Sequence, residues 1–202
     1  MVQGYHLIIT AYGFWLPNDP RGSWSDFVGA WELRRFGPAT KVNTRRSRAS
    51  TEHDRQLRLD AKSALKYPPV SFTGEQALSV SRGFAKTAEQ DQLRVWACAI
   101  LPEHAHLVIG RHPLTIERIA QRLKRGATRQ LVQDCRHPFQ HLMDDEGRVP
   151  KVWARGQWKS ILNNESDIRR AIGYVELNPI KERKRRQYWA FVTPFVAPFG
   201  RG

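Results

Sequence analysis

The sequence predicts an α+β protein in which one antiparallel sheet is built from elements in the order β-α-β-β-α-β, with one further helix after them. Three observations predict it. Short runs rich in β-branched and aromatic residues alternate with two long stretches that have the apolar spacing of helices. Two of the short runs follow each other directly, as in a hairpin. The chain has 202 residues, 41% of them hydrophobic, which is enough to bury one core.

The first half of the chain supplies one strand, an insertion and one helix. The first strand is predicted over 5–12, where aromatic and β-branched residues dominate. Residues of about 15–70 are rich in proline and glycine and are predicted to be an insertion, with a short helix near 54–65. Thr73 and Gln76 have the spacing of a capping box, so a helix is expected from there to about residue 90.

The second half supplies a hairpin, a long basic helix, the last strand and the final helix. Strands are predicted over 93–101 and 104–110, a helix over 114–134 and a strand over 151–162. Asn164 or Ser166 can cap the final helix. That helix is expected to end or kink near Leu177, because Pro179 disfavours helical dihedrals at the residue before it. The tail, about 187–202, is expected to pack against the body.

This order of elements is that of the ferredoxin-like fold, in which two helices cover one face of an antiparallel sheet. The other face is then available for a functional site, and the final helix is expected to pack on that face or at its rim. No internal repeat is evident, so we predict a single domain over 1–202 that carries the insertion and the tail.

The charge of the chain indicates the class of partner. Lys and Arg total 33 against 19 Asp and Glu, which gives a net charge of +14. A protein this basic attracts polyanions, among which nucleic acid is the commonest. Two cysteines provide neither a disulfide framework nor a zinc knuckle. With no signal-peptide pattern and no apolar run near the roughly 20 residues that span a bilayer, we expect a cytoplasmic protein without a membrane partner.

Two histidines lie two residues apart in the segment 101–109, LPEHAHLVI. Side chains alternate along a strand, so His104 and His106 are expected on one face and Ala105 and Leu107 on the other, in the core. Their α-carbons would be roughly 7 Å apart, close enough for both rings to hold one metal ion. Taken alone, the pattern is more often two structural histidines, because short motifs match by chance.

A second pair of residues lies in the segment 174–179, YVELNP. Residues four apart share a helix face, so Tyr174 and Asn178 are expected to project together. A phenol and an amide placed side by side can serve as nucleophile and neutral metal ligand. Taken alone, the pattern is more often a half-buried tyrosine and an asparagine that caps the helix.

Together, the strings LPEHAHLVI, LKRGATRQL, VWARGQWKSIL and YVELNP resemble the REP-associated tyrosine transposases, which belong to the HUH group of single-tyrosine transposases. The resemblance covers about 93–181. It implies that His104 and His106 are metal ligands, that Asn178 is the third ligand and that Tyr174 is the nucleophile. Glu103 departs from the family, whose members more often have Asn there. Strand alternation points Glu103 away from the metal, so we do not count it as a ligand.

The resemblance also implies an activity, that of a single-strand DNA endonuclease and strand transferase acting on hairpin or palindromic repeat DNA. A tyrosine attack on a phosphodiester leaves a 5′-phosphotyrosine and a free 3′-hydroxyl. A tyrosine phenol is protonated at neutral pH, so a divalent ion is needed to polarise the phosphate. Two imidazoles and an amide are uncharged and should bind metal weakly, which favours exchangeable Mg²⁺ or Mn²⁺ over a structural zinc.

DNA-binding residues are predicted in three places. The polar face of the helix over 114–134 contains Arg122, Lys124, Arg125 and Arg129, and a basic run after the tyrosine contains Lys181, Lys184, Arg185 and Arg186. These two regions are expected to border one groove. Trp153 and Trp158 flank Arg155 and could stack on unpaired bases. The alternative is that the charges are solvated surface and the tryptophans are core.

Two other functions stay open at this point. One is a catalytically inactive nucleic-acid-binding module on the same fold, although no RNP-like aromatic pattern is present. The other is a nickase of the replication or conjugation initiator type, which uses the same chemistry. The sequence leaves a homodimer and a monomer both open.

Overall fold

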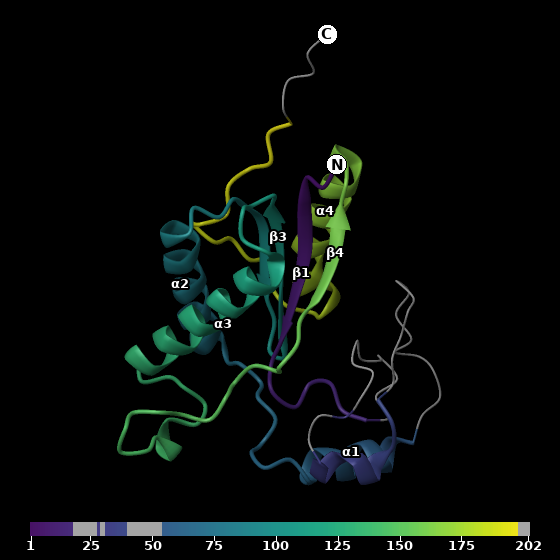
Figure 1. Cartoon of the computed structure of the whole chain (residues 1–202), viewed down its shortest axis with the longest axis vertical. Coiled ribbons are helices and arrows are strands. Elements are labelled where there is room, and N and C mark those ends of the chain that lie inside the picture. The colour runs from purple at the N-terminus through teal and green to yellow at the C-terminus, as the bar shows by residue number, and fades with distance from the viewer. Residues whose placement is uncertain (18–27, 29–30, 40–53, 198–202) are drawn as a thin grey trace.

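In a computed structural model, residues 1–17, 28, 31–39 and 54–197 are described. Within them four strands form one sheet: β1 (Gly4–Thr10), β2 (Val95–Ile100), β3 (His104–Gly110) and β4 (Trp158–Leu162). The strand order is β2-β3-β1-β4, and each neighbouring pair is antiparallel. The predicted α+β class and antiparallel sheet are confirmed (Figure 1).

Helices cover both faces of this sheet (Figure 1). On one face α2 (Gly74–Gln90) and α3 (Ile116–Gln133) pack against each other and enclose the main core, which includes Leu7, Leu107 and Phe84. On the other face α4 (Glu165–Lys181) buries Ile168 and Val175 against β2 and β3. The final helix therefore lies where the sequence predicted it, on the face that α2 and α3 leave open.

The helix starts follow from local sequence. The Thr73 hydroxyl accepts a hydrogen bond from the Gln76 backbone N–H at 3.2 Å, and the Gln76 side chain accepts from the Thr73 N–H at 3.0 Å, which completes the predicted capping box of α2. Thr115 caps α3 and Asn164 caps α4, and each side chain accepts a hydrogen bond from the backbone N–H of the third helical residue. Each cap stabilises its helix by about 1 kcal/mol.

The last strand is shorter than the sequence predicted. β4 begins at Trp158 rather than Lys151, and the residues before it make an isolated bridge between Trp153 and Ala11. Two carbonyls of that segment accept hydrogen bonds from the side chain of Lys124 instead of from a neighbouring strand. The alternation of apolar and polar residues does not tell whether backbone carbonyls will bond to a neighbouring strand or to a side chain such as Lys124.

The C-terminal end of α4 also differs from its prediction. The helix continues through Pro179 to Lys181 instead of ending near Leu177. Pro179 is buried, and the turn after it is closed by a hydrogen bond from the Lys184 N–H to the Pro179 carbonyl at 2.8 Å. Packing against the sheet thus outweighs the local cost of the proline, and it keeps Asn178 in the helix.

The insertion and the tail contribute smaller structures. The short helix expected near 54–65 is present as α1 (Arg55–Ser63), and it packs with the 3-10 turn η1 (Trp31–Phe36). A second 3-10 turn, η2 (Gln140–Leu142), follows α3. The rest of the predicted insertion, 18–27, 29–30 and 40–53, lies outside the described residues, as does 198–202 of the tail.

No helix among the described residues has the length and apolar character needed to cross a membrane.

The described part of the tail runs along β2. The side-chain amide of Gln187 donates to the Ile100 carbonyl and accepts from the Ile100 N–H, both at 2.7 Å, as a neighbouring strand would. The Thr193 N–H donates to the Val95 carbonyl at 2.8 Å. These contacts cover the open edge of the sheet, which is otherwise a template for pairing with another chain.

A close approach between α2 and α3 gives a first prediction. A β-carbon added at Gly83 would lie 2.5 Å from the α-carbon of Ala127 and 2.6 Å from the carbonyl oxygen of Gly126, both backbone atoms. Gly83→Ala should therefore destabilise the protein by about 1–3 kcal/mol through overpacking. Gly173→Ala in α4 is the matched control, because its β-carbon meets nothing within 4 Å.

Denaturant unfolding of both variants checks this prediction. Gly173→Ala should be neutral or stabilising by up to about 1 kcal/mol, since alanine is the better helix former. Equal stabilities for the two variants would contradict the close packing of α2 on α3.

Candidate active site

The two histidines of the motif lie on the face of the sheet that α4 covers. In the β1–β3 pairing His106 is opposite Ile8 and His104 is opposite Thr10. The intervening Ala105 and Leu107 are fully buried on the other face, in the core beneath α2 and α3. The rings of His104 and His106 lie 4.8 Å apart, centroid to centroid. The pleat of β3 thus places two imidazoles side by side.

A third histidine, which the sequence analysis did not single out, completes the group. His6 on β1 lies with its Nε2 3.0 Å from Nδ1 of His106, and the two rings are stacked with centroids 5.2 Å apart. Both side chains are buried. We call His6, His104 and His106 the histidine cluster.

Two members of the histidine cluster, His6 and His106, are held in an uncharged form by their surroundings. Burial lowers the pKa of His6 to about 4. Burial also lowers the pKa of His106 well below its usual range, with smaller contributions from His104 and His6. Both rings are therefore neutral at pH 7. A neutral imidazole has a lone pair with which to bind a metal ion, whereas an imidazolium has none.

Tyr174 of α4 lies beside this cluster. Its ring centroid is 5.7 Å from that of His6 and 5.7 Å from that of His106, edge-on in both cases. The side chain is nevertheless 44% exposed, so a substrate can reach it. The ammonium group of Lys181, one of the predicted DNA-binding residues, lies 4.7 Å from the centre of the tyrosine ring, within the range of a cation–π contact. A reachable phenol, buried imidazoles and a cation thus share one place on the molecule.

Two further residues follow Tyr174 at intervals of four, Asn178 within α4 and Glu182 directly after it. Asn178 is buried, and its side-chain nitrogen has no hydrogen-bond partner among the described residues. Glu182, the residue that ends the helix, has a carboxylate oxygen 3.8 Å from Nε2 of His104. Since i, i+4 and i+8 fall on one helix face, the three residues form a row along the histidine cluster.

The side chains of His104, His106 and Asn178 fit the ion that the sequence predicts. The unpartnered atom of Asn178 is its amide nitrogen, a hydrogen-bond donor that an oxygen of a bound phosphate can satisfy, while the amide oxygen is the atom that can bind an ion. His104, His106 and Asn178 supply two nitrogen donors and one amide, a set compatible with Mn²⁺ or Mg²⁺ when substrate oxygens complete the shell. Among the described residues no three His, Cys, Asp or Glu side chains form a metal-binding group by themselves. The side chains alone should therefore hold an ion weakly.

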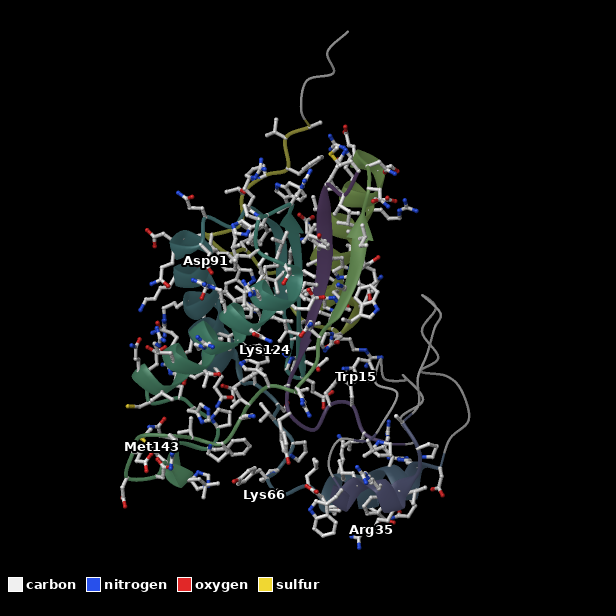
Figure 2. The ribbon with its side chains drawn as sticks, viewed as in Figure 1. Trp15, Arg35, Lys66, Asp91, Lys124 and Met143 are labelled. Carbon is white, nitrogen blue, oxygen red and sulfur yellow. The ribbon has the colours of Figure 1, made fainter. Side chains whose placement is uncertain are left out.

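The predicted DNA-binding residues of α3 lie on the other side of the sheet from the histidine cluster. Arg122 pairs with Asp91 at 2.6 Å. Lys124, which is labelled in Figure 2, donates to the carbonyls of Ala154 and Gly156 at 2.8 and 2.6 Å. Burial lowers the pKa of Lys124 to about 8.

Arg125 and Arg129 of the same helix are exposed. Because α3 and α4 cover opposite faces of the sheet, the α3 residues and the run from Lys181 to Arg186 do not border one groove. This expectation from the sequence was wrong, since periodicity alone does not tell which face of a sheet a helix covers.

The remaining candidates divide between core and surface. Trp153 is buried, with its ring packed against Phe72 and Phe84, a position that favours a structural role. Trp158 lies on the face of the histidine cluster, with its ring edge-on to His6 at 5.2 Å. The other candidates are exposed side chains: Arg155, Lys181, Lys184, Arg185 and Arg186.

Two solved structures are similar to this chain at low sequence identity. One is a REP-associated tyrosine transposase bound to a REP hairpin, with 13% identity and a TM-score of 0.45 over 89% of this chain and 68% of that chain. The other is a candidate transposase from Deinococcus radiodurans R1, with 13% identity and a TM-score of 0.41 over 93% of this chain and 94% of that chain. No protein-family model matches the chain, and no curated protein does. The function proposed below rests on the site itself and on the sequence motifs.

Proposed function

We propose that the protein is a metal-dependent enzyme that nicks and joins single-stranded DNA, a transposase-like activity directed at hairpin or palindromic repeat DNA. The observation that carries the proposal is the contact between Tyr174 and the histidine cluster. A reachable phenol from α4 lies against two buried, neutral imidazoles, one of which belongs to the motif on β3. The proposal includes the finer description of the fold, a ferredoxin-like βαββαβ core whose added C-terminal helix carries the nucleophile.

In the proposed reaction the phenol oxygen of Tyr174 attacks the phosphorus of a phosphodiester. The bond from phosphorus to the 3′ oxygen breaks, a 5′-phosphotyrosine forms, and the 3′ oxygen leaves as a hydroxyl. The linkage conserves the energy of the broken bond, so another 3′-hydroxyl can attack it and join two strands. A divalent ion, Mg²⁺ or Mn²⁺, held by His104, His106 and Asn178 would supply the polarisation of the phosphate.

The chain's own residues have distinct tasks in this reaction. Burial keeps His106 neutral and so able to act as a ligand. The ammonium group of Lys181 lies over the tyrosine ring, where it attracts both the anionic DNA and the negative charge that develops on the phenol oxygen. The edge contacts with His6 and His106 restrict the tyrosine ring to one place, which lowers the cost of orienting the nucleophile.

The proposal is tested with a labelled single-stranded hairpin DNA, incubated with the full chain and Mg²⁺ or Mn²⁺ and separated under denaturing conditions. The expected result is a shorter DNA strand together with a protein–DNA adduct that survives denaturation. An inactive nucleic-acid-binding module would bind the DNA and yield neither product. An initiator-type nickase would also form the adduct, because it uses the same chemistry.

The basic run after α4 gives a second prediction, on DNA binding. Lys184, Arg185 and Arg186 are exposed and follow directly on the helix that carries the nucleophile. Each phosphate contact with a single strand contributes about −0.7 to the slope of log affinity against log salt, so five contacts give roughly −3.5. Replacing all three residues by alanine should flatten that slope by about 2 while keeping the preference for a hairpin, because phosphate contacts position the DNA and do not select it.

The matched comparison is the double variant Arg125→Ala/Arg129→Ala on α3, which removes exposed charge from the other side of the sheet. Its slope should change less, because α3 lies on the face of the sheet opposite to α4, which carries Tyr174. Binding titrations across a range of salt concentrations measure both slopes. An unchanged slope in the triple variant would show that the basic run is only solvated surface.

A further inference from the structure

We infer that His6 is a positioning residue for the metal site: its Nε2 accepts the Nδ1 proton of His106 and so keeps Nε2 of His106 unprotonated and free to bind the ion. The inference rests on the proposed function, because it concerns the support of a ligand in that site. It assigns a role to a buried histidine on β1 that lies outside both motifs.

The geometry between the two rings is specific. His6 lies opposite Val108 in the strand pairing, and His106 lies opposite Ile8, so the two histidines are diagonal neighbours on one face of the sheet. Their nitrogens, Nε2 of His6 and Nδ1 of His106, are 3.0 Å apart, the length of a full hydrogen bond. Both side chains are more than nine-tenths buried, so water does not compete for this contact.

The tautomers of this pair decide whether His106 can be a ligand. A neutral imidazole has one N–H donor and one acceptor nitrogen, so the hydrogen bond can form in two ways. If His6 donates from Nε2, then His106 has its own proton on Nε2 and cannot bind metal through that atom. If His106 donates from Nδ1, its Nε2 has a free lone pair. Metal-binding histidines donate their other N–H to a partner in this second way, and the partner orients the ring.

A competing role for His6 is simple packing. Its ring also contacts Trp158 and Tyr174, each edge-on, and an aromatic ring of any kind could fill that space. Two substitutions separate the roles. His6→Phe keeps an aromatic ring and removes the acceptor nitrogen. His6→Gln removes the ring and places an amide oxygen, an acceptor, near the position of Nε2.

The first experiment measures the binding of Mn²⁺ to the purified full chain by electron paramagnetic resonance, without DNA. His6→Phe should bind Mn²⁺ roughly 10- to 100-fold more weakly than the original chain, the usual effect of removing the partner of a ligand. His6→Gln should stay within a few-fold of the original. The reverse order, with Phe tolerated and Gln not, would assign His6 to packing and overturn the inference. Circular dichroism and thermal unfolding of both variants verify that the fold is kept.

The second experiment reads the tautomers directly, from ¹⁵N chemical shifts of the imidazole nitrogens in the metal-free protein. Both His6 and His106 should be protonated on Nδ1, and a proton on Nε2 of His106 overturns the inference whether or not metal binds. His106→Ala separates this outcome from a failure of the proposed function. The original chain could bind Mn²⁺ no better than His106→Ala does while His106 is protonated on Nδ1. That result would overturn the metal site of the proposed function and would leave the hydrogen bond from His106 to His6 as assigned.

Discussion

Tyr174→Phe should abolish both DNA cleavage and the covalent protein–DNA adduct while leaving DNA binding unchanged. The substitution removes only the phenol oxygen, and the ring keeps its edge contacts with His6 and His106. The ammonium group of Lys181 also keeps its position over the ring. Loss of a covalent nucleophile costs roughly 10⁴-fold or more in rate, so no adduct should be detectable on a denaturing gel.

Tyr188→Phe is the matched control for this prediction. Tyr188 is a second tyrosine near the C-terminus, is highly exposed, and has no ring contact with the histidine cluster in the part of the chain that the structure describes. Its variant should cleave at the original rate. An adduct that persists in Tyr174→Phe and disappears in Tyr188→Phe would assign the nucleophile to the tail and remove the basis of the proposed site.

The features that sequence reasoning predicted are those that depend on short spacings. The two-residue period of β3 placed His104 and His106 on one face, and the four-residue spacing in α4 placed Tyr174 and Asn178 together, because both patterns follow from the geometry of a single element. The capping box at Thr73 is equally local. Such features need no knowledge of how elements meet.

The features that sequence reasoning missed depend on contacts between distant parts of the chain. His6 and His106 are 100 residues apart, and they meet only because β1 pairs with β3 in one register. A shift of one residue would move His6 to the other face of the sheet. Glu182 was missed for a related reason: Pro179 was expected to end the helix, and only the packing of α4 on the sheet continues the row of residues as far as position 182.

His104→Ala and His106→Ala should each abolish cleavage, but their effects on stability should differ. His104 is the less buried of the two, with 14% of its side chain exposed, so its loss should cost less stability than the loss of His106. His106 is buried and bonded to His6, so its truncation leaves a cavity and a buried nitrogen without its partner. That loss should destabilise the protein by about 1–3 kcal/mol. Denaturant unfolding measured beside the cleavage assay separates the two effects.

Removal of metal gives the matching result without mutation. Cleavage by the original chain should stop in EDTA and return when Mn²⁺ or Mg²⁺ is added in excess, because two imidazoles and an amide hold an ion only weakly. The two alanine variants should remain inactive at the same metal concentrations, and the folded His104→Ala protein should still bind the hairpin. Cleavage that continues in EDTA, or in the folded His104→Ala variant, would mean that the histidine cluster supports the tyrosine only by packing and that the phosphate is activated by another group.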